Sequence, residues 1–269
     1  RPDRAHLDRE RLGRALRGAG VAPSTTAMLL TQLDLRDHAE RKFGSFARQM
    51  VFTRDGLEQS TRMVVAALHA QRFRAAGATR VADLGCGIGG DALAMAGLGL
   101  GVVAVDIDED AAAAAAVNLR AFPGAQVRRA DVADLDLPAL ADEGVDALFA
   151  DPARRSGATR GGTRLLGPEQ WSPPLSTVLS WRGTFGRIGV KMAPGVPHEV
   201  LPLDCSVQWT SVDGDLLEAA LWTPALAPEG PGRSALVIGE GRAHTLTDPA
   251  TTTPDAPVRE APVGVLGAF

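Results

Sequence analysis

The spacing of apolar residues divides the chain into a helical part and a part in which strands and helices alternate. Residues 1–76 carry apolar positions at helical spacing, and Gly18 and Gly20 end the first helix. A second helix follows the capping segment 22–25. A third begins near residue 57, and its residues 57–68 are expected to pack against the sheet domain that follows. The apolar positions are Leu7, Leu12 and Leu16 in the first helix, Met28, Leu29, Leu30 and Leu33 in the second, and Met63, Val64, Val65, Ala67 and Leu68 in the third.

From residue 79 onward, short apolar runs alternate with helical patterns. The predicted strands are residues 81–84, 101–105, 126–129, 145–150 and 187–192, and helices are predicted at 92–97 and 110–122. Strands that alternate with helices are typical of βαβ units. The sequence therefore predicts an α/β fold with a doubly wound parallel sheet and an N-terminal helical extension.

The alternation of strands and helices ends after residue 194, and two antiparallel hairpins are predicted beyond it. Residues 206–212 and 216–222 are joined by Asp213-Gly214, a pair that favours a tight turn. A Pro- and Gly-rich linker, 224–232, precedes a hairpin of residues 234–239 and 242–247. We expect three parts: a helical region 1–76, a sheet domain 77–224, and a C-terminal linker and hairpin 225–269 that leads to a further module.

Composition and charge narrow the class of protein. A hydrophobic content of 45% suits a globular core, and a net charge of −4 argues neither for nor against a nucleic-acid partner. The basic stretches, 1–20 and 151–164, fit either nucleic-acid contacts or a solvated surface. Two cysteines make no disulfide framework, and we find no secretory signal or membrane-length apolar run. These features predict a cytoplasmic protein, and both ends look like cuts within a longer chain.

The segment 81–90, VADLGCGIGG, predicts a strand that runs into a cofactor-binding glycine turn. Gly85, Gly87 and Gly90 satisfy the dinucleotide pattern G-x-G-x-x-G. Gly85, Gly87 and Gly89, with Asp83 before them, also satisfy D-x-G-x-G-x-G. The next strand ends in Asp106, where an acid can bind the two hydroxyls of a ribose.

The second pattern resembles the first motif of class I S-adenosylmethionine-dependent methyltransferases, and the likeness extends over residues 79–223. It implies a Rossmann-like methyltransferase sheet, with parallel strands and a terminal antiparallel hairpin, that binds S-adenosyl-L-methionine. The resemblance assigns Asp106 to the ribose, Ile107 and Asp131 to the adenine, and Asp151-Pro152 to the catalytic motif.

The charge of Asp83 favours this cofactor over a dinucleotide. A carboxylate beside the glycine turn opposes a pyrophosphate but suits the ammonium group of S-adenosylmethionine. Other roles stay open, because Asp83 could cap the turn through backbone contacts, Asp106 could be an acid that ends a strand, and Asp131 has acidic neighbours in its loop.

Two further likenesses concern the acceptor. Lys42-Phe43 and residues 52–61 look like the lead-in of trimethylguanosine-synthase-like RNA methyltransferases, in which a Thr at the position of Thr61 lies near the cofactor. Segments 151–155, 191–195 and 211–218 are similar to bacterial methyltransferases that carry a C-terminal THUMP-like domain. The resemblance implies methylation of ribosomal or transfer RNA and an RNA-binding module that is absent from this chain.

The catalytic motif departs from the amino-methylating pattern, in which Asp, Asn or Ser precedes Pro-Pro and an aromatic residue. Ala153 and Arg154 stand where the second Pro and the ring are expected. Asp151 can still accept a hydrogen bond from a target amine, and Arg154 can stack on a base or pair with a phosphate. We assign Arg154, Arg155 and Lys191 to substrate binding, although Lys191 could instead pair with Asp151 or Glu218.

The sequence leaves two alternatives open. A nicotinamide-dependent oxidoreductase would use the literal G-x-G-x-x-G pattern, and a non-catalytic RNA-binding protein would explain the altered catalytic motif. No His, Cys or carboxylate cluster has the spacing of a metal site, and neither a membrane nor a metal is expected as a partner. Trp171 and Trp181 are expected in packing rather than in base stacking, and the oligomeric state is not predicted.

Overall fold

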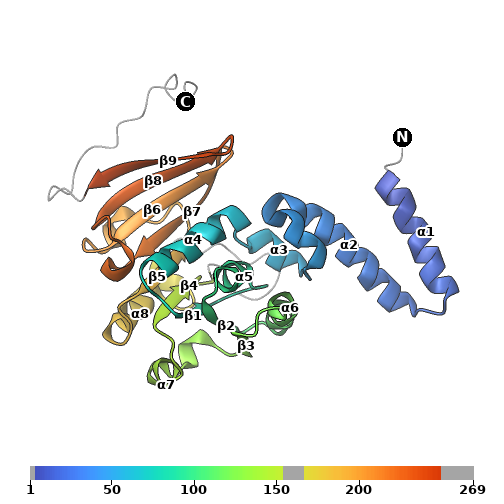
Figure 1. Cartoon of the computed structure of the whole chain (residues 1–269), viewed down its shortest axis with the longest axis horizontal. Helices are drawn as coiled ribbons and strands as arrows, with labels where there is room; N and C mark the ends of the chain where they lie inside the picture. The colour runs from blue at the N-terminus through green and yellow to red at the C-terminus, as the bar shows by residue number, and fades with distance from the viewer. Residues whose placement is uncertain (1–3, 154–166, 250–269) are drawn as a thin grey trace.

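The computed structural model describes residues 4–153 and 167–249, and it has a helical arm leading into a layered α/β domain (Figure 1). The arm and the first covering helix are α1 (Arg4–Gly18), α2 (Pro23–Phe43), η1 (Gly44–Gln49), α3 (Arg54–Gln59) and α4 (Met63–Ala75). In Figure 1, α1 and the first half of α2 project away from the sheet, whereas α4 lies over it. None of the helices in the described part combines the length and apolar character that crossing a bilayer requires.

Two expectations about these helices are corrected. Met28 and Leu29, predicted on the apolar face of the second helix, are exposed, and the helix instead buries Leu35, Ala39 and Phe43 in its second half. Only that half reaches the domain, so the burial follows position rather than periodicity. The predicted third helix is divided into α3 and α4, because residues 60–62 contain extended backbone at Ser60 and Arg62.

Within the described residues, nine strands form one sheet in the order β3-β2-β1-β4-β5-β7-β6-β8-β9. The elements from β1 to β5 alternate as predicted, and they are β1 (Arg80–Leu84), α5 (Gly90–Gly97), β2 (Gly101–Asp106), α6 (Glu109–Leu119), β3 (Ala125–Arg129), η2 (Val132–Asp134), α7 (Leu137–Asp142), β4 (Ala147–Ala150), η3 (Pro168–Gln170), α8 (Leu175–Ser180), η4 (Trp181–Gly183) and β5 (Ile188–Met192). Strands β3, β2, β1, β4 and β5 are parallel, which confirms the doubly wound sheet.

The remaining elements confirm the terminal antiparallel hairpin: η5 (His198–Val200), β6 (Ser206–Val212), β7 (Asp215–Trp222), η6 (Pro224–Leu226), β8 (Gly232–Gly239) and β9 (Arg242–Pro249). Asp213 and Gly214 both have positive φ, as a two-residue hairpin turn of this kind requires. Strand β8 pairs in parallel with β6, so the last hairpin extends the same sheet across residue 224. Part of the expected linker is buried, at Leu226 and Ala227. The domain division at 224 stays a prediction.

Two hydrophobic clusters lie on the opposite faces of the sheet. On one face, Phe149 and Trp222 stack with ring centroids 6.1 Å apart. Gly189 permits this, because a Cβ there would lie 2.4 Å from the Trp222 ring. On the other face Trp171 and Trp181 are buried, which agrees with the packing role expected for both.

Candidate active site

The register of the sheet brings three predicted site residues to one edge. Leu84, the last residue of β1, pairs with Val105 of β2 and with Ala150 of β4. The residues that follow these three, namely Gly85, Asp106 and Asp151, therefore lie side by side at the carboxyl ends of parallel strands. The strand order reverses direction at β1 and β4, which is where open α/β sheets bind their ligands.

Two glycines of the turn after β1, Gly85 and Gly87, have different surroundings. Gly85 has φ +83°, and a Cβ there would lie 2.6 Å from the Asp151 carbonyl oxygen, so the close approach of β4 requires glycine. Gly87 has φ +54°, yet no heavy atom among the described residues lies within 4 Å of its ideal Cβ position. The turn thus leaves open space beside Gly87.

Asp106 braces this turn. One carboxylate oxygen accepts from the backbone N–H of Gly87 at 2.7 Å, and the other accepts from that of Asp108 at 2.9 Å. Burial, opposed by these two hydrogen bonds, raises the pKa of Asp106. Each oxygen retains a lone pair for a ligand hydroxyl, so bracing the turn and binding a ribose are compatible. Ile107 follows and is 62% exposed, beside the edge where an adenine is expected.

Asp131 has a local structural role. Its carboxylate accepts from the backbone N–H of Ala133 at 2.9 Å and caps η2. The adenine contact expected of Asp131 stays a prediction, as do the ligand contacts of Asp106 and Ile107.

Asp83 is buried in an unusual environment. Its Oδ2 is buried and has no hydrogen-bond partner among the described residues. Burial, and after it the charges of Asp91 and Asp151, raises the pKa of Asp83 well above its ordinary value. The backbone of Ala92, in the first turn of α5, donates to this side chain, which gives only partial support to a capping role.

Asp151 and Lys191 form an ion pair at the same edge. The Lys191 Nζ donates to Asp151 Oδ2 at 2.7 Å, and the Lys191 residue is only 6% exposed. Burial lowers the pKa of Lys191, but Asp151, Asp91 and Glu218 outweigh it and raise the pKa overall. The pairing anticipated for Lys191 with Asp151 is therefore present, and its substrate contact stays a prediction.

The two residues after Asp151 pack against the protein. Pro152 is buried, and Ala153 pairs with Ser172 through backbone hydrogen bonds of 2.9 and 3.0 Å. Arg154 and Arg155, which we assigned to substrate binding, lie outside the described residues.

A buried polar chain that the sequence did not reveal lies behind this edge. Thr61 donates to Asp91 Oδ2 at 2.6 Å, Asp91 Oδ1 lies 2.8 Å from His69 Nδ1, and His69 Nε2 lies 2.7 Å from Glu218 Oε1. Burial opposes protonation of His69, but the two carboxylates raise its pKa to about 10. A protonated His69 therefore joins two carboxylates that come from α5 and β7.

His69 escaped notice because it is a single histidine among apolar residues of a helix. The signal for Glu218 was present in the segment 211–218, but nothing local connects the two residues. Thr61, predicted to lie near the cofactor, donates to Asp91 in the first turn of α5, and its contact with a ligand stays a prediction.

The cluster has a charge suited to a cationic ligand. Four acids, Asp83, Asp91, Asp151 and Glu218, share the region with two bases, His69 and Lys191. With Asp83 protonated the cluster carries a net charge of −1 (three carboxylates against two cations), and with Asp83 ionised it carries −2. S-adenosylmethionine presents an ammonium and a sulfonium, and the unpartnered Asp83 oxygen and the open side of Gly87 fit it. A pyrophosphate would meet repulsion.

In the described part of the chain, no group of three His, Cys, Asp or Glu side chains is arranged to hold a metal ion.

Comparisons with known proteins agree with this geometry. Residues 81–154 match the family described as "Methyltransferase domain". The chain is 34% identical over 218 residues to an uncharacterized S-adenosylmethionine-dependent methyltransferase of Mycobacterium tuberculosis, found in strains CDC 1551 / Oshkosh and H37Rv. That alignment covers 77% of this chain and 56% of the relative, so the chain spans little more than half the length of the curated relatives it matches.

A solved structure shares the fold. The crystal structure of a candidate methyltransferase from Porphyromonas gingivalis W83 superposes with a TM-score of 0.66 at 19% identity, over 84% of this chain and 58% of that one.

Proposed function

The chain belongs to the class I S-adenosylmethionine-dependent methyltransferases, and from this premise we propose that the protein methylates a nucleotide of structured RNA, either ribosomal or transfer RNA. One observation carries the assignment of the reaction to the sheet edge at the carboxyl ends of β1 and β4. Asp151 directly follows β4, beside the glycine turn. Its carbonyl oxygen would lie 2.6 Å from a Cβ at residue 85, and its carboxylate accepts a hydrogen bond from Lys191. A hydrogen-bond acceptor fixed beside the cofactor turn is what methylation of an amine requires.

We assign cofactor binding to Asp83, the three glycines of the turn, Asp106 and Ile107, with Thr61 and Asp131 at the margins. When bound, S-adenosylmethionine supplies a methyl group that its sulfonium makes electrophilic. The chain's own contribution is alignment, which can lower a barrier by roughly 7–11 kcal/mol when two reactants are held in position.

Asp151 is the proposed catalytic residue. Lys191 occupies Oδ2, and Oδ1 accepts no hydrogen bond from the described residues, so Oδ1 is available to a target N–H. The carboxylate would orient the amine lone pair and stabilise the positive charge that develops on nitrogen. The backbone carbonyl of Pro152 is proposed as a second acceptor, and its ring restricts the backbone that presents it.

Transfer of labelled methyl groups tests this function. The full-length protein is purified and incubated with total RNA and with S-adenosylmethionine that carries a tritiated methyl group, and cofactor binding is measured by calorimetry with S-adenosylhomocysteine. We expect label in RNA, and mass spectrometry of the nucleosides would then identify the modified atom. A protein that binds S-adenosylhomocysteine but labels no RNA would contradict the RNA substrate.

Variants separate catalysis from binding. Asp151→Ala should reduce transfer by at least about 10²-fold, as the loss of one preorganised electrostatic group does, while leaving S-adenosylhomocysteine binding nearly unchanged. Asp142→Ala, at the exposed end of α7, is the matched control and should keep wild-type transfer. If Asp151→Ala keeps full activity, Asp151 has been assigned the wrong role.

The comparisons bear on one of the two alternatives and leave the other to experiment. The domain match and the relatives support S-adenosylmethionine and leave the nicotinamide hypothesis without support, which calorimetry with NAD would verify. The non-catalytic hypothesis rests on the altered Asp-Pro-Ala-Arg motif, and the same transfer experiment distinguishes it.

A further inference from the structure

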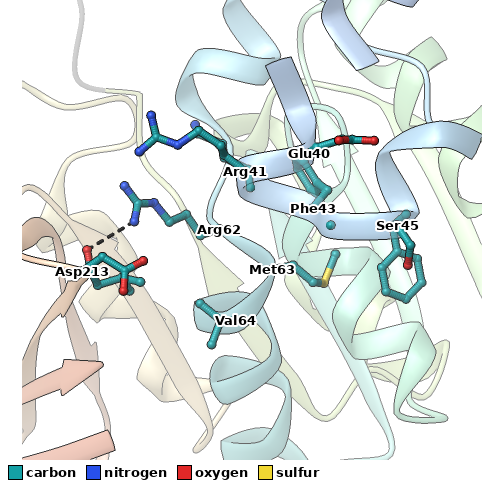
Figure 2. Close-up of a pocket in the computed structure, with 12 residues that line it drawn as sticks. Glu40, Arg41, Phe43, Ser45, Arg62, Met63, Val64 and Asp213 are labelled. Atoms are coloured by element: carbon teal, nitrogen blue, oxygen red, sulfur yellow. Dashed lines mark hydrogen bonds between the residues drawn. The ribbon is translucent and has the colours of Figure 1, made fainter. Parts of the chain in front are cut away.

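A hollow of about 380 Å³ lies outside the crevice of the glycine turn, between the N-terminal helices and the β6–β7 turn (Figure 2). Its lining includes Arg41, Lys42, Phe46, Arg62, Met63 and Val64. We propose that this hollow binds one nucleotide of the RNA substrate, with the base against Phe46 and a phosphate at Arg41 and Arg62. The inference rests on the proposed function and identifies a part of the substrate site that none of the predicted residues accounts for.

The walls of the hollow come from segments far apart in the sequence. The end of α2 contributes Arg41, η1 contributes Phe46, and Arg62 stands immediately before α4. Val212 and Asp213 close the hollow from the β6–β7 turn. The hollow therefore exists only because the helical arm is fixed against the methyltransferase sheet.

Arg62 is fixed in place by this arrangement. Its guanidinium donates to the Val212 carbonyl oxygen at 3.2 Å and also to the carboxylate of Asp215. A guanidinium that is already ordered loses little entropy when it binds an anion.

Arg41 supplies a second guanidinium to the hollow, whose lining also includes the acids Glu40 and Asp213. Arg41 is exposed and forms no ion pair within the ranges that the structure describes. Figure 2 shows the guanidinium groups of Arg41 and Arg62 on the same side of the hollow, while Glu40 points away from them. Two neighbouring guanidinium groups favour a bidentate anion such as a phosphate.

Lys42 forms part of the wall of the hollow. Its ammonium donates to the carbonyl oxygens of Leu57, Glu58 and Ser60 at 2.7, 2.7 and 2.9 Å, so it shapes the turn after α3. Burial, and after it the charges of Lys191 and Arg62, lowers its pKa to about 8.

The apolar part of the lining fits a base. Phe46 is 52% exposed and Val64 is 43% exposed, so the hollow that contains the cations also presents accessible apolar side chains. Single-stranded nucleic acids are bound by this combination of aromatic faces for bases and cations for the backbone. An acidic peptide would use the cations but not the aromatic face.

The size and position of the hollow suit a nucleotide near the reacting one. Its volume falls within the range of small-ligand pockets, and a neighbouring hollow of about 590 Å³ shares Arg41, Lys42 and Arg62 and adds Arg54. Arg62 directly follows Thr61, whose hydroxyl bonds to Asp91 of the buried polar chain. One short turn thus connects the hollow to the methyl-transfer edge.

Direct binding measurements test the inference. The probe is a fluorescent adenosine homopolymer of about ten nucleotides, titrated into the purified protein and followed by anisotropy at several salt concentrations. Arg41→Ala and Phe46→Leu should each weaken RNA binding by about fivefold or more, while Phe46→Tyr, which keeps the ring, should bind like the wild type. Arg41→Ala should also reduce the salt slope by about 0.7.

A matched control removes the same charge elsewhere. Arg74→Ala lies in the last turn of α4, whose first turn borders the hollow, and should change RNA affinity by less than about twofold. All variants should bind S-adenosylhomocysteine like the wild type, which excludes general misfolding.

The outcomes separate this inference from the proposed function. Wild-type RNA affinity in Phe46→Leu and Arg41→Ala, or equal binding of polyglutamate and RNA, would overturn the nucleotide site even if the protein methylates RNA. Loss of binding in these two variants, without any methyl transfer by the wild type, would support the nucleotide site and contradict the proposed function.

Discussion

Lys191 and Asp151 form an ion pair that crosses from β5 to the end of β4, with the ammonium 2.7 Å from one carboxylate oxygen. Lys191 is almost fully buried, whereas the Asp151 side chain is 25% exposed. The lysine therefore faces the protein and the carboxylate faces the crevice. This asymmetry supports the role proposed for Asp151 at the substrate, and we propose Lys191 as the residue that positions it.

Replacing Lys191 should impair turnover more than cofactor binding. Lys191→Met removes the cation that holds Asp151, so we expect kcat for methyl transfer to fall by about tenfold or more with little change in the KM for S-adenosylmethionine. The unfolding free energy should fall by about 2 kcal/mol, less than for a fully buried pair because Asp151 is partly solvated. Lys191→Arg should restore part of kcat, which a purely structural role would not require, and unchanged kcat in Lys191→Met would contradict the positioning role.

The pH dependence of stability should report His69. Its pKa is raised from 6.5 to about 10, so its protonation stabilises the folded state fully below about pH 6.5 and this contribution is lost as the pH rises toward 10. We expect the unfolding free energy, measured by urea denaturation, to decrease between pH 7 and pH 10.

The variant His69→Gln should show less of this decrease. At pH 7 it should also lose about 3–5 kcal/mol, because Asp91 and Glu218 would be left without their cation. His38→Gln, on the exposed side of α2, serves as the control and should reproduce the wild-type profile. An identical pH profile in His69→Gln would refute a protonated His69.

Replacing Asp83 should raise the stability of the protein and lower its affinity for the cofactor. Its raised pKa means that folding is favoured with the carboxyl protonated and that this stability is lost as the pH rises through the folded-state pKa. Asp83→Asn should therefore unfold at a higher temperature than the wild type at neutral and alkaline pH. The same variant should bind S-adenosylmethionine about tenfold more weakly, since it cannot pair with the ammonium group.

Calorimetry in buffers of different ionisation enthalpy provides a second readout for Asp83. The wild type should release protons when S-adenosylmethionine binds, and Asp83→Asn should release fewer. Equal proton release in the two proteins would mean that Asp83 does not face the ammonium group.

Two glycines of the turn should respond differently to the same substitution. Gly85→Ala introduces a Cβ at 2.6 Å from the Asp151 carbonyl oxygen at a residue with φ +83°, so it should cost more than the roughly 1–2 kcal/mol of the backbone strain alone. Gly87→Ala meets open space and should cost only that strain, but its methyl group should weaken S-adenosylhomocysteine binding. Thermal unfolding and calorimetry check the pair, and equal stability losses would contradict the close approach of β4 to Gly85.

The sequence predicted the elements that local periodicity encodes. The strand that ends at Leu84, its glycine turn and the acid at Asp106 follow from apolar runs and turn residues only a few positions apart. It could not predict the contact of His69 with Glu218, because 149 residues separate them and no local pattern connects the two. The same reason hides the contact of Arg62 with Asp215, 153 residues away, and hence the hollow that it borders.

The predicted burial of Met28 and Leu29 in α2 was wrong for a related reason. Periodicity indicates which face of a helix is apolar, but the end of the helix that reaches a partner depends on how the whole arm is placed. Met28 satisfies the helical pattern and still faces solvent, whereas Phe43 packs at the far end of the same helix.

The parallel pairing of β8 with β6 has a consequence for how the protein can be divided. A chain cut after residue 224 would leave the N–H and C=O groups along one side of β6 without partners, and such an open edge invites association with other chains. Strands β8 and β9 are therefore integral to the same sheet as the glycine turn, through continuous backbone pairing. A truncation that keeps this sheet whole has to fall beyond Pro249, where the pairing of β9 with β8 ends.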